Sequence, residues 1–133
     1  MTRNTLESNN RDVIERLVND YNMSEVEANI ILYLSSRRRS TVGKVRKFFM
    51  YPVGIIDSSI TSLFEKGFIT KEKKIYRETI SYIQVEITNL ALKTLKITKI
   101  EKELFIVNNK LRKLKLRKKK LIEMKDEVNE YSS

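Results

Sequence analysis

The side chains in this sequence with the clearest chemistry are its cations, and these are clustered. The chain has 27 Lys and Arg residues against 17 Asp and Glu, a formal net charge of +10 over 133 residues. Residues 35–51 carry six cations and no acid, and residues 89–120 carry twelve cations and two acids. Clustered ammonium and guanidinium groups attract phosphates, so the pattern predicts a polyanionic partner, either nucleic acid or an anionic membrane surface.

Several other chemistries are excluded by composition. The sequence contains no cysteine and no histidine, which removes disulfides, thiolate nucleophiles, the usual general base and the commonest metal ligand. Its acidic residues show no paired spacing, and its three glycines form no phosphate-cradling loop. We therefore expect a binding protein, not an enzyme, that uses no cofactor and no metal.

A cytoplasmic location is expected. No stretch approaches eighteen consecutive apolar residues, and the first ten residues lack the basic and apolar pattern of an export signal. A role at a membrane surface is less favoured, because the apolar stripe of the C-terminal segment is narrow and better explained by a second helix. A basic DNA-binding protein in this compartment would be associated with the nucleoid.

The elements that position these cations begin with two amphipathic helices. Residues 11–21 place apolar side chains at three- and four-residue spacings, which predicts a helix with one buried face. Ser24 and Glu27 have the spacing of a capping box, so a second helix is expected to begin at Glu25. Its apolar periodicity stops before Arg37, where cations suit the carbonyl end of a helix.

Two shorter helices are predicted next. Residues 41–50 place Val42, Val45 and Phe49 on one face, and the only proline, Pro52, follows the helix. Residues 55–66 form a second helical pattern, with Ile56, Ile60, Leu63 and Phe64 directed inward. Gly67 supplies the left-handed residue that commonly closes a helix.

The period of the pattern then changes. Residues 68–87 alternate in polarity and are rich in β-branched residues, which predicts a hairpin with its turn near residues 77–79. Residues 89–130 contain neither proline nor glycine and carry a heptad pattern typical of a coiled coil, with Asn108-Asn109 as a possible break. The seam that would mediate dimerisation consists of Leu90, Ile97, Ile100, Leu104, Val107, Leu111, Leu114 and Leu121.

The order of these elements predicts an α+β fold, mainly α with a small β-hairpin. Residues 1–88 would form a winged helix-turn-helix domain and residues 89–133 a long dimerisation helix. The segment MSEVEANIILYLSS at 23–36 resembles the capped second helix of MarR- and PadR-type and related small archaeal winged-helix regulators. TVGKVRKFFMYPVGIIDSSITSLFEKGFITKEKK at 41–74 resembles their helix, turn, recognition helix and wing, and VEITNLALKTL at 85–95 is similar to their entry into the dimerising helix.

The resemblance implies that residues 55–66 enter the major groove of double-stranded DNA while the wing at 68–87 contacts the backbone or minor groove. The expected exposed positions of that helix are Asp57 and four hydroxyl residues. None of these is the Arg, Asn or Gln that reads a base by two hydrogen bonds, so modest sequence specificity is expected. A solvated helix face is the alternative interpretation. The hydroxyl candidates are Ser58, Ser59, Thr61 and Ser62.

Phosphate contacts are expected from the cations around the first helix of the motif and from the wing. A charged, solvated surface is the alternative for both groups, and the wing cations share their hairpin with Glu72 and Glu78. The candidates near the first helix are Arg37, Arg38, Arg39, Lys44, Arg46 and Lys47, and those of the wing are Lys71, Lys73, Lys74 and Arg77. The cationic run at 110–120 is interpreted equally well as DNA contact or as a solvated face.

The charge pattern of the C-terminal helix favours an antiparallel homodimer. Parallel chains in register would place the cationic run of 110–120 on itself. If two chains cross near residue 112, Glu123 and Glu127 fall near Lys102 and Lys96 of the second copy.

These features lead to one main function and two alternatives. The main hypothesis is a homodimeric transcriptional regulator that binds double-stranded DNA. The first alternative is an architectural chromatin or partition protein of low sequence specificity, and the second is a coiled-coil module that binds another protein.

Overall fold

The structure is a computed structural model that describes residues 2–132, with side chains described for residues 10–130. Residues are grouped into two compact units, Met1–Lys99 and Ile100–Ser133. The described chain is mainly helical with one small antiparallel sheet, which confirms the expected α+β class. In chain order the elements are α1 (Thr2–Tyr21), α2 (Glu25–Arg37), β1 (Arg39–Thr41), α3 (Val42–Phe49), α4 (Val53–Glu65), β2 (Ile69–Arg77), β3 (Ile80–Ile87) and α5 (Asn89–Ser132).

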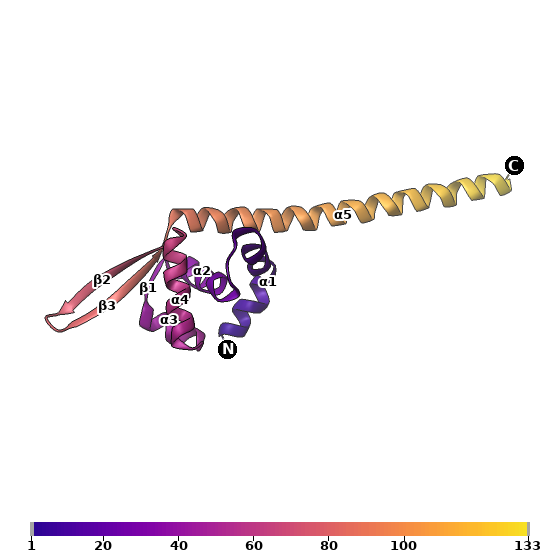
Figure 1. The fold of residues 1–133 in the computed structure, drawn as a ribbon. Helices are drawn as coiled ribbons and strands as arrows, with labels where there is room; N and C mark the ends of the chain where they lie inside the picture. Colours follow the sequence, from indigo (N-terminus) through magenta and orange to yellow (C-terminus); the bar gives the residue numbers. More distant parts are fainter. Residues whose placement is uncertain (1, 133) are drawn as a thin grey trace. The chain divides into compact units, whose positions relative to one another are not determined.

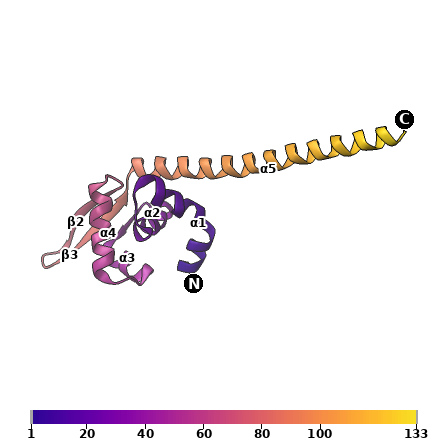
Figure 2. The same ribbon diagram turned by 45° about the vertical axis from the view of Figure 1, so that its right-hand side comes forward.

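The core of the first unit lies between one face of each of its helices. Helix α1 packs on α2, and α2 packs on α4, as Figures 1 and 2 show from two directions. The predicted apolar stripes supply the core, and Leu17, Phe49 and Leu63 have no exposed surface. Phe64 is the exception, because 45% of its surface is exposed instead of packing inward.

The helix starts are fixed by local hydrogen bonds, as the sequence indicates. The Glu27 amide donates to Ser24 Oγ at 3.1 Å, and the Ser24 amide donates to Glu27 Oε1 at 3.3 Å. This capping box starts α2 at Glu25, as predicted. Helix α1 begins well before the predicted residue 11, and its backbone departs from helical angles at Asn10 (φ −119°, ψ 16°).

The sheet has the order β1–β3–β2, and both pairings are antiparallel. Strand β1 was not predicted, since three residues are too short for an alternating pattern to stand out; it pairs with residues 84–86 of β3. Strands β2 and β3 continue beyond β1 as a two-stranded ribbon (Figure 1). The ribbon is irregular between Ile75 and Arg77, so Tyr76 is an extra residue with no partner across the pair.

Helix α5 starts in the first unit. Thr88 Oγ1 accepts a hydrogen bond from the Ala91 amide at 3.3 Å, and Ala91 and Leu95 are buried in the core of this unit. The first unit therefore continues past the expected boundary between residues 88 and 89.

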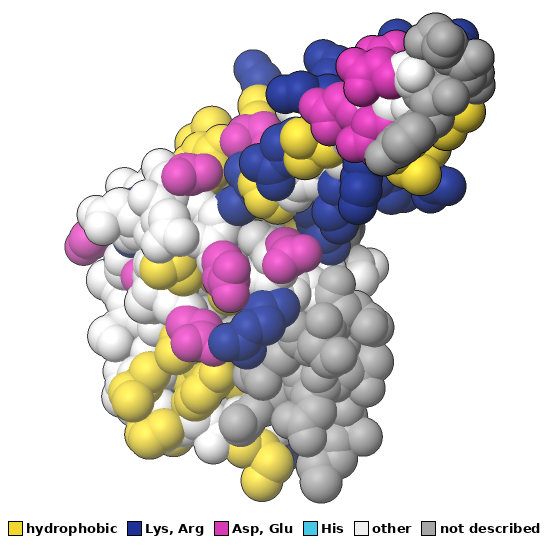
Figure 3. All heavy atoms as spheres, turned by 90° about the vertical axis from the view of Figure 1, so that its right-hand side faces the viewer, with side chains coloured by type: hydrophobic (Ala, Val, Ile, Leu, Met, Phe, Trp, Pro, Cys, Tyr) yellow, Lys and Arg dark blue, Asp and Glu magenta, His cyan; other side chains and the backbone are white. Residues whose placement is uncertain are grey.

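The described part of the second unit is helix alone, and Asn108-Asn109 does not interrupt it. Hydrophobic, basic and acidic side chains are interleaved along the part of α5 visible in Figure 3, with acidic side chains near its end. Among the described residues, no helix is both long enough and apolar enough to cross a membrane.

Candidate nucleic-acid interface

Helices α3 and α4 are joined by a tight turn. Thr41 caps α3 through its hydroxyl, which accepts from the Lys44 amide at 3.2 Å, and Met50 ends the helix in the left-handed conformation (φ 56°, ψ 21°). Pro52 precedes the first residue of α4, where its missing amide leaves no bond unmade. The buried face of α4 packs against α2 and α3. Its exposed face presents Gly54, Ile55, Ser58, Thr61, Phe64 and Glu65.

An ion pair links the two helices. Arg46 of α3 donates to the Asp57 carboxylate of α4 through Nη2 at 2.7 and 2.9 Å and through Nε at 3.0 Å. These hydrogen bonds, with the charge of Asp57, raise the pKa of Arg46 above its ordinary value, while desolvation opposes the shift. Arg46 was predicted as a phosphate contact, and the structure shows its guanidinium already engaged by Asp57.

The four hydroxyl candidates of α4 do not share one environment. Thr61 is exposed, and Ser58 is exposed with its hydroxyl donating to the Ile55 carbonyl at 3.1 Å. Ser59 is buried, with 7% of its surface exposed, so the expectation that it lies on the outward face is wrong. Ser62 was also expected to face outward, but its hydroxyl donates at 3.1 Å to Glu27 of α2. The buried face of α4 is therefore rotated from the predicted one: it includes Ser59 instead of Phe64, and it brings Ser62 against α2.

The packed side of α4 meets the carboxylate of Glu27 on α2. This carboxylate accepts from Ser62 and, at 2.9 Å, from Lys66 Nζ, which also donates to the Asn22 carbonyl at 2.7 Å. Glu27 has only 7% of its surface exposed. The charge is thus compensated inside the fold, and these residues fix α4 on α2.

The three arginines at and just after the end of α2 are exposed, and each is held differently. Arg37 places its guanidinium carbon 4.0 Å from the centre of the Tyr33 ring and 5.2 Å from that of Phe48. Arg38 has a positive φ (70°, ψ −49°), which is strained for a residue with a Cβ. Its amide donates to Leu34 and its carbonyl accepts from Ile87 at 2.8 Å. Arg39 of β1 lies opposite Glu86.

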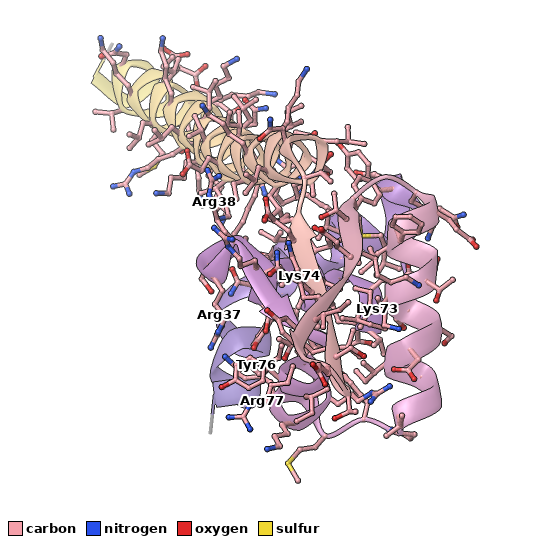
Figure 4. All side chains as sticks on the ribbon, turned by 90° about the vertical axis from the view of Figure 1, so that its left-hand side faces the viewer. Arg37, Arg38, Lys73, Lys74, Tyr76 and Arg77 are labelled. Carbon is pink, nitrogen blue, oxygen red and sulfur yellow. The ribbon has the colours of Figure 1, made fainter. Side chains whose placement is uncertain are left out.

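The register of the β2–β3 ribbon separates its cations into two faces. Lys71 is opposite Val85, which is fully buried, so Lys71 and Lys73 share the face of the core and of α4. Lys74 is on the other face, where its ammonium contacts Glu72 at 3.1 Å. Figure 4 shows Lys73 on the side of α4 and Lys74 on the side of Arg37 and Arg38.

A shallow pocket of about 170 Å³ lies between α3, α4 and the base of the ribbon. It brings Lys71 and Thr61 beside the Arg46–Asp57 pair, with Ile83 on the ribbon side. Lys44 and Lys47 are exposed on α3. Two cations from neighbouring elements, Arg46 of α3 and Lys71 of the ribbon, therefore lie beside α4. Among the described residues, no group of three or more His, Cys, Asp or Glu could hold a metal ion.

Comparison with known proteins gives a clear result only at the level of structure. No family model and no curated protein matches this chain. A transcriptional regulator homologue from Pyrococcus horikoshii OT3 is 21% identical with a TM-score of 0.60, over 72% of this chain and 95% of that one. YusO from Bacillus subtilis is 7% identical with a TM-score of 0.60, over 80% and 74%. Apo MarR from E. coli is 8% identical with a TM-score of 0.56, over 71% and 68%.

This chain has the winged helix-turn-helix fold. The predicted resemblance to MarR-type regulators is confirmed at the level of the fold. Helices α3 and α4 are the helix-turn-helix, α4 is in the position of the recognition helix, and the β2–β3 ribbon is the wing.

The wing of this winged helix-turn-helix has an apolar end that sequence reasoning missed. Ile75, Tyr76 and Ile80 expose 75%, 66% and 50% of their surfaces. The Arg77 guanidinium carbon lies 5.3 Å from the centre of the Tyr76 ring. We name Ile75, Tyr76 and Ile80 the wing tip. The alternating sequence predicted the two strands, but it did not show how far the ribbon extends beyond the core.

The seam residues on α5 are also exposed. Within the first unit, Leu90 and Ile97 expose 51% and 39% of their surfaces, while Ala91 and Leu95 of the same helix face the core. In the second unit the seam residues expose between 48% (Ile100, Leu111) and 64% (Leu114) of their surfaces. The described part of the second unit is one helix, so its apolar row has no other described element of that unit to pack against.

Proposed function

We propose that this chain is a homodimeric transcriptional regulator that binds double-stranded DNA, with α4 in the major groove and the wing on the backbone. One observation carries the proposal: α4 is contacted by α3 and by β2 of the wing, and both of these elements carry exposed cations, Lys44 and Lys47 on α3 and Lys71 and Lys73 on the wing. Groups so placed would hold phosphates on both sides of an inserted helix. A MarR mutant from E. coli complexed with operator DNA has a similar fold, at 8% identity and a TM-score of 0.55.

A second candidate function is architectural binding with little sequence preference. It is favoured by the exposed face of α4, which offers Ser58 and Thr61 but no Arg, Asn or Gln. Hydroxyl groups accept and donate to several bases, so they discriminate weakly. Affinity for one palindromic site far above that for other duplexes would support the regulator, and equal affinity for all duplexes would support the architectural role.

The homodimer is proposed from the exposed seam and from charge. An antiparallel pairing about residue 112 would bring Glu123 and Glu127 of one chain near Lys102 and Lys96 of the other, and would leave only the central cations repelling one another. Two winged domains on one dimer would contact DNA together, which raises affinity without new contacts.

The experiment that tests DNA binding is a titration of a duplex with the full chain between 50 and 300 mM salt, roughly the range in which phosphate contacts are lost. Wild type should show a steep fall of affinity with salt. Lys44→Ala and Lys47→Ala should each lower the log–log slope by about 0.9 per subunit. Arg11→Ala removes the same charge from an exposed position on α1 and should leave the slope unchanged. Equal slopes for all four proteins would overturn the proposal.

A further inference from the structure

We infer that the wing tip inserts into the minor groove of DNA and partly opens a base step, so that the protein recognises duplexes by their deformability. The inference rests on the proposed DNA binding and names how the wing would contribute to it. The juxtaposition that carries it is an exposed apolar tip, formed by Ile75, Tyr76 and Ile80, beside the cations Lys73, Lys74 and Arg77.

The exposed apolar surface of the wing tip indicates that it binds a partner. Two isoleucines and a tyrosine with at least half of their surfaces in water are a costly arrangement at the end of a ribbon. None of the three is in the hydrophobic core. Apolar side chains that enter DNA act as wedges between base pairs, and isoleucine is among the residues used in this way.

The backbone at the tip is suited to project side chains. Ile75 is paired with Ser81 and Arg77 with Ile80, which leaves Tyr76 as the bulged residue between them. A bulge redirects the side chain that it carries. The Arg77 guanidinium over the Tyr76 ring, at 5.3 Å, places a cation directly beside the apolar surface.

Charge favours DNA over a neutral protein surface as the occupant. Within five residues of the turn, the two faces of the wing carry Lys73, Arg77 and Lys74, the last of which also contacts Glu72. Phosphates line both walls of a minor groove. Figure 4 shows these three cations and Tyr76 on the wing. Glu78, in the turn itself, opposes this attraction and gives a residue whose removal should strengthen binding.

The dimensions require the DNA to change shape. Paired strands are about 4.8 Å apart before side chains are added, and the minor groove is about 6 Å wide. The tip therefore enters only where the groove opens, and opening it kinks the duplex toward the major groove by about 20–90°. Pyrimidine–purine steps such as TA kink most easily, whereas runs of adenine are stiff. The difference in the ease of kinking between base steps would give the protein a sequence preference that the exposed hydroxyls of α4 do not provide.

The test compares wild type with Ile75→Thr/Ile80→Thr, which keeps β-branched residues in the strands and replaces an apolar ethyl group by a hydroxyl at each position. Duplexes of about 20 base pairs, long enough for two helical turns, carry donor and acceptor dyes at their ends and either central TA steps or an adenine run. Wild type should bend the TA duplex and bind it about tenfold more tightly than the adenine-run duplex, the effect of roughly 1.4 kcal/mol of deformation energy. The double variant should still bind DNA but lose both the bend and the preference.

Two control variants separate the wedge from the charges. Lys73→Ala should lower the salt slope while the bend is retained, and Glu78→Gln should raise affinity with the bend unchanged. A wild type that binds DNA without bending it, or a double variant that bends it equally, overturns the inference and leaves the proposed function standing. No binding of wild type to either duplex overturns both. If only the double variant fails to bind anionic phosphatidylglycerol vesicles, while DNA bending is unaltered, the tip serves a membrane and the inference is wrong.

Discussion

Arg46 of α3 and Asp57 of α4 are joined across the helix-turn-helix by hydrogen bonds of 2.7 to 3.0 Å to one carboxylate. The pair links α4 to the preceding helix, and it neutralises a cation that in the proposed complex would otherwise face phosphates. Both side chains are about 40% exposed, so solvent screens the pair and its contribution to stability is small. Its main effect should be on DNA binding.

Asp57→Ala should strengthen DNA binding, because it releases Arg46 to contact a phosphate and removes a carboxylate from the interface. The log–log salt slope should become steeper by about 0.9 per subunit. Arg46→Ala/Asp57→Ala is the matched control and should return the slope to the wild-type value. Weaker binding by Asp57→Ala would mean that the pair serves to orient α4.

The hydroxyls of α4 should separate into contact and packing groups. Thr61→Ala should weaken DNA binding by about 1 kcal/mol, the worth of one hydrogen bond, since Thr61 is exposed. Ser59→Ala removes a hydroxyl from the buried side of the helix and should leave affinity unchanged. Affinity titrations at one salt concentration check both variants, and an equal loss for the two would contradict the burial of Ser59.

Ser62→Ala should destabilise the fold without changing DNA affinity. The variant removes a hydrogen bond to the buried carboxylate of Glu27, and bonds to charged groups contribute about 1.5–3 kcal/mol. Urea unfolding should show a lower midpoint with an unchanged slope. Ser58→Ala, whose hydroxyl bonds a carbonyl of its own exposed helix, is the control and should shift the midpoint far less.

Arg38→Gly should raise stability while it lowers DNA affinity. Glycine adopts the positive φ of residue 38 without strain, so the free energy of unfolding should increase by about 0.5–1 kcal/mol. If Arg38 contacts a phosphate, the salt slope should fall by about 0.9 per subunit. An unchanged slope would remove Arg38 from the interface. Arg38→Ala should lower the slope equally but, with the strain retained, give no gain in stability.

Leu114→Glu should dissociate the proposed dimer, since it places a charge in the seam. Leu116→Glu is a closely matched control, because Leu116 is equally exposed (62% against 64%) but lies outside the heptad rows. Sedimentation should give a monomer mass for the first variant and a dimer mass for the second. A dimer mass for both would show that the seam does not hold the chains together.

The orientation of the dimer can be read by cross-linking, because the natural chain has no cysteine. In an antiparallel pairing about residue 112, Leu104 lies near Leu121 of the second copy. A mixture of Leu104→Cys and Leu121→Cys chains should therefore form mixed disulfides under mild oxidation, with few Leu104→Cys homodimers. Predominant Leu104→Cys homodimers would indicate a parallel pairing.

Elements whose causes lie within a few residues could be predicted from the sequence. The capping box of Ser24 and Glu27 starts α2 as expected, and Gly67 takes the positive φ that closes α4 (φ 81°). The apolar periods of α1 to α4 selected most of the core, because burial follows the spacing of side chains on one helix face. The clusters of cations could also be found without the structure, because they are runs of neighbouring residues in the sequence.

Other properties were decided by contacts between segments far apart in the chain. Strand β1 exists because residues 84–86 lie beside it, and Lys71 and Lys74 separate onto two faces because of the register with β3. Asp57 meets Arg46, and Ser62 meets Glu27 35 residues away, only after the helices pack. Local sequence sets which residues share a face, whereas tertiary packing sets what that face meets, and the latter decides which cations are free to meet a phosphate.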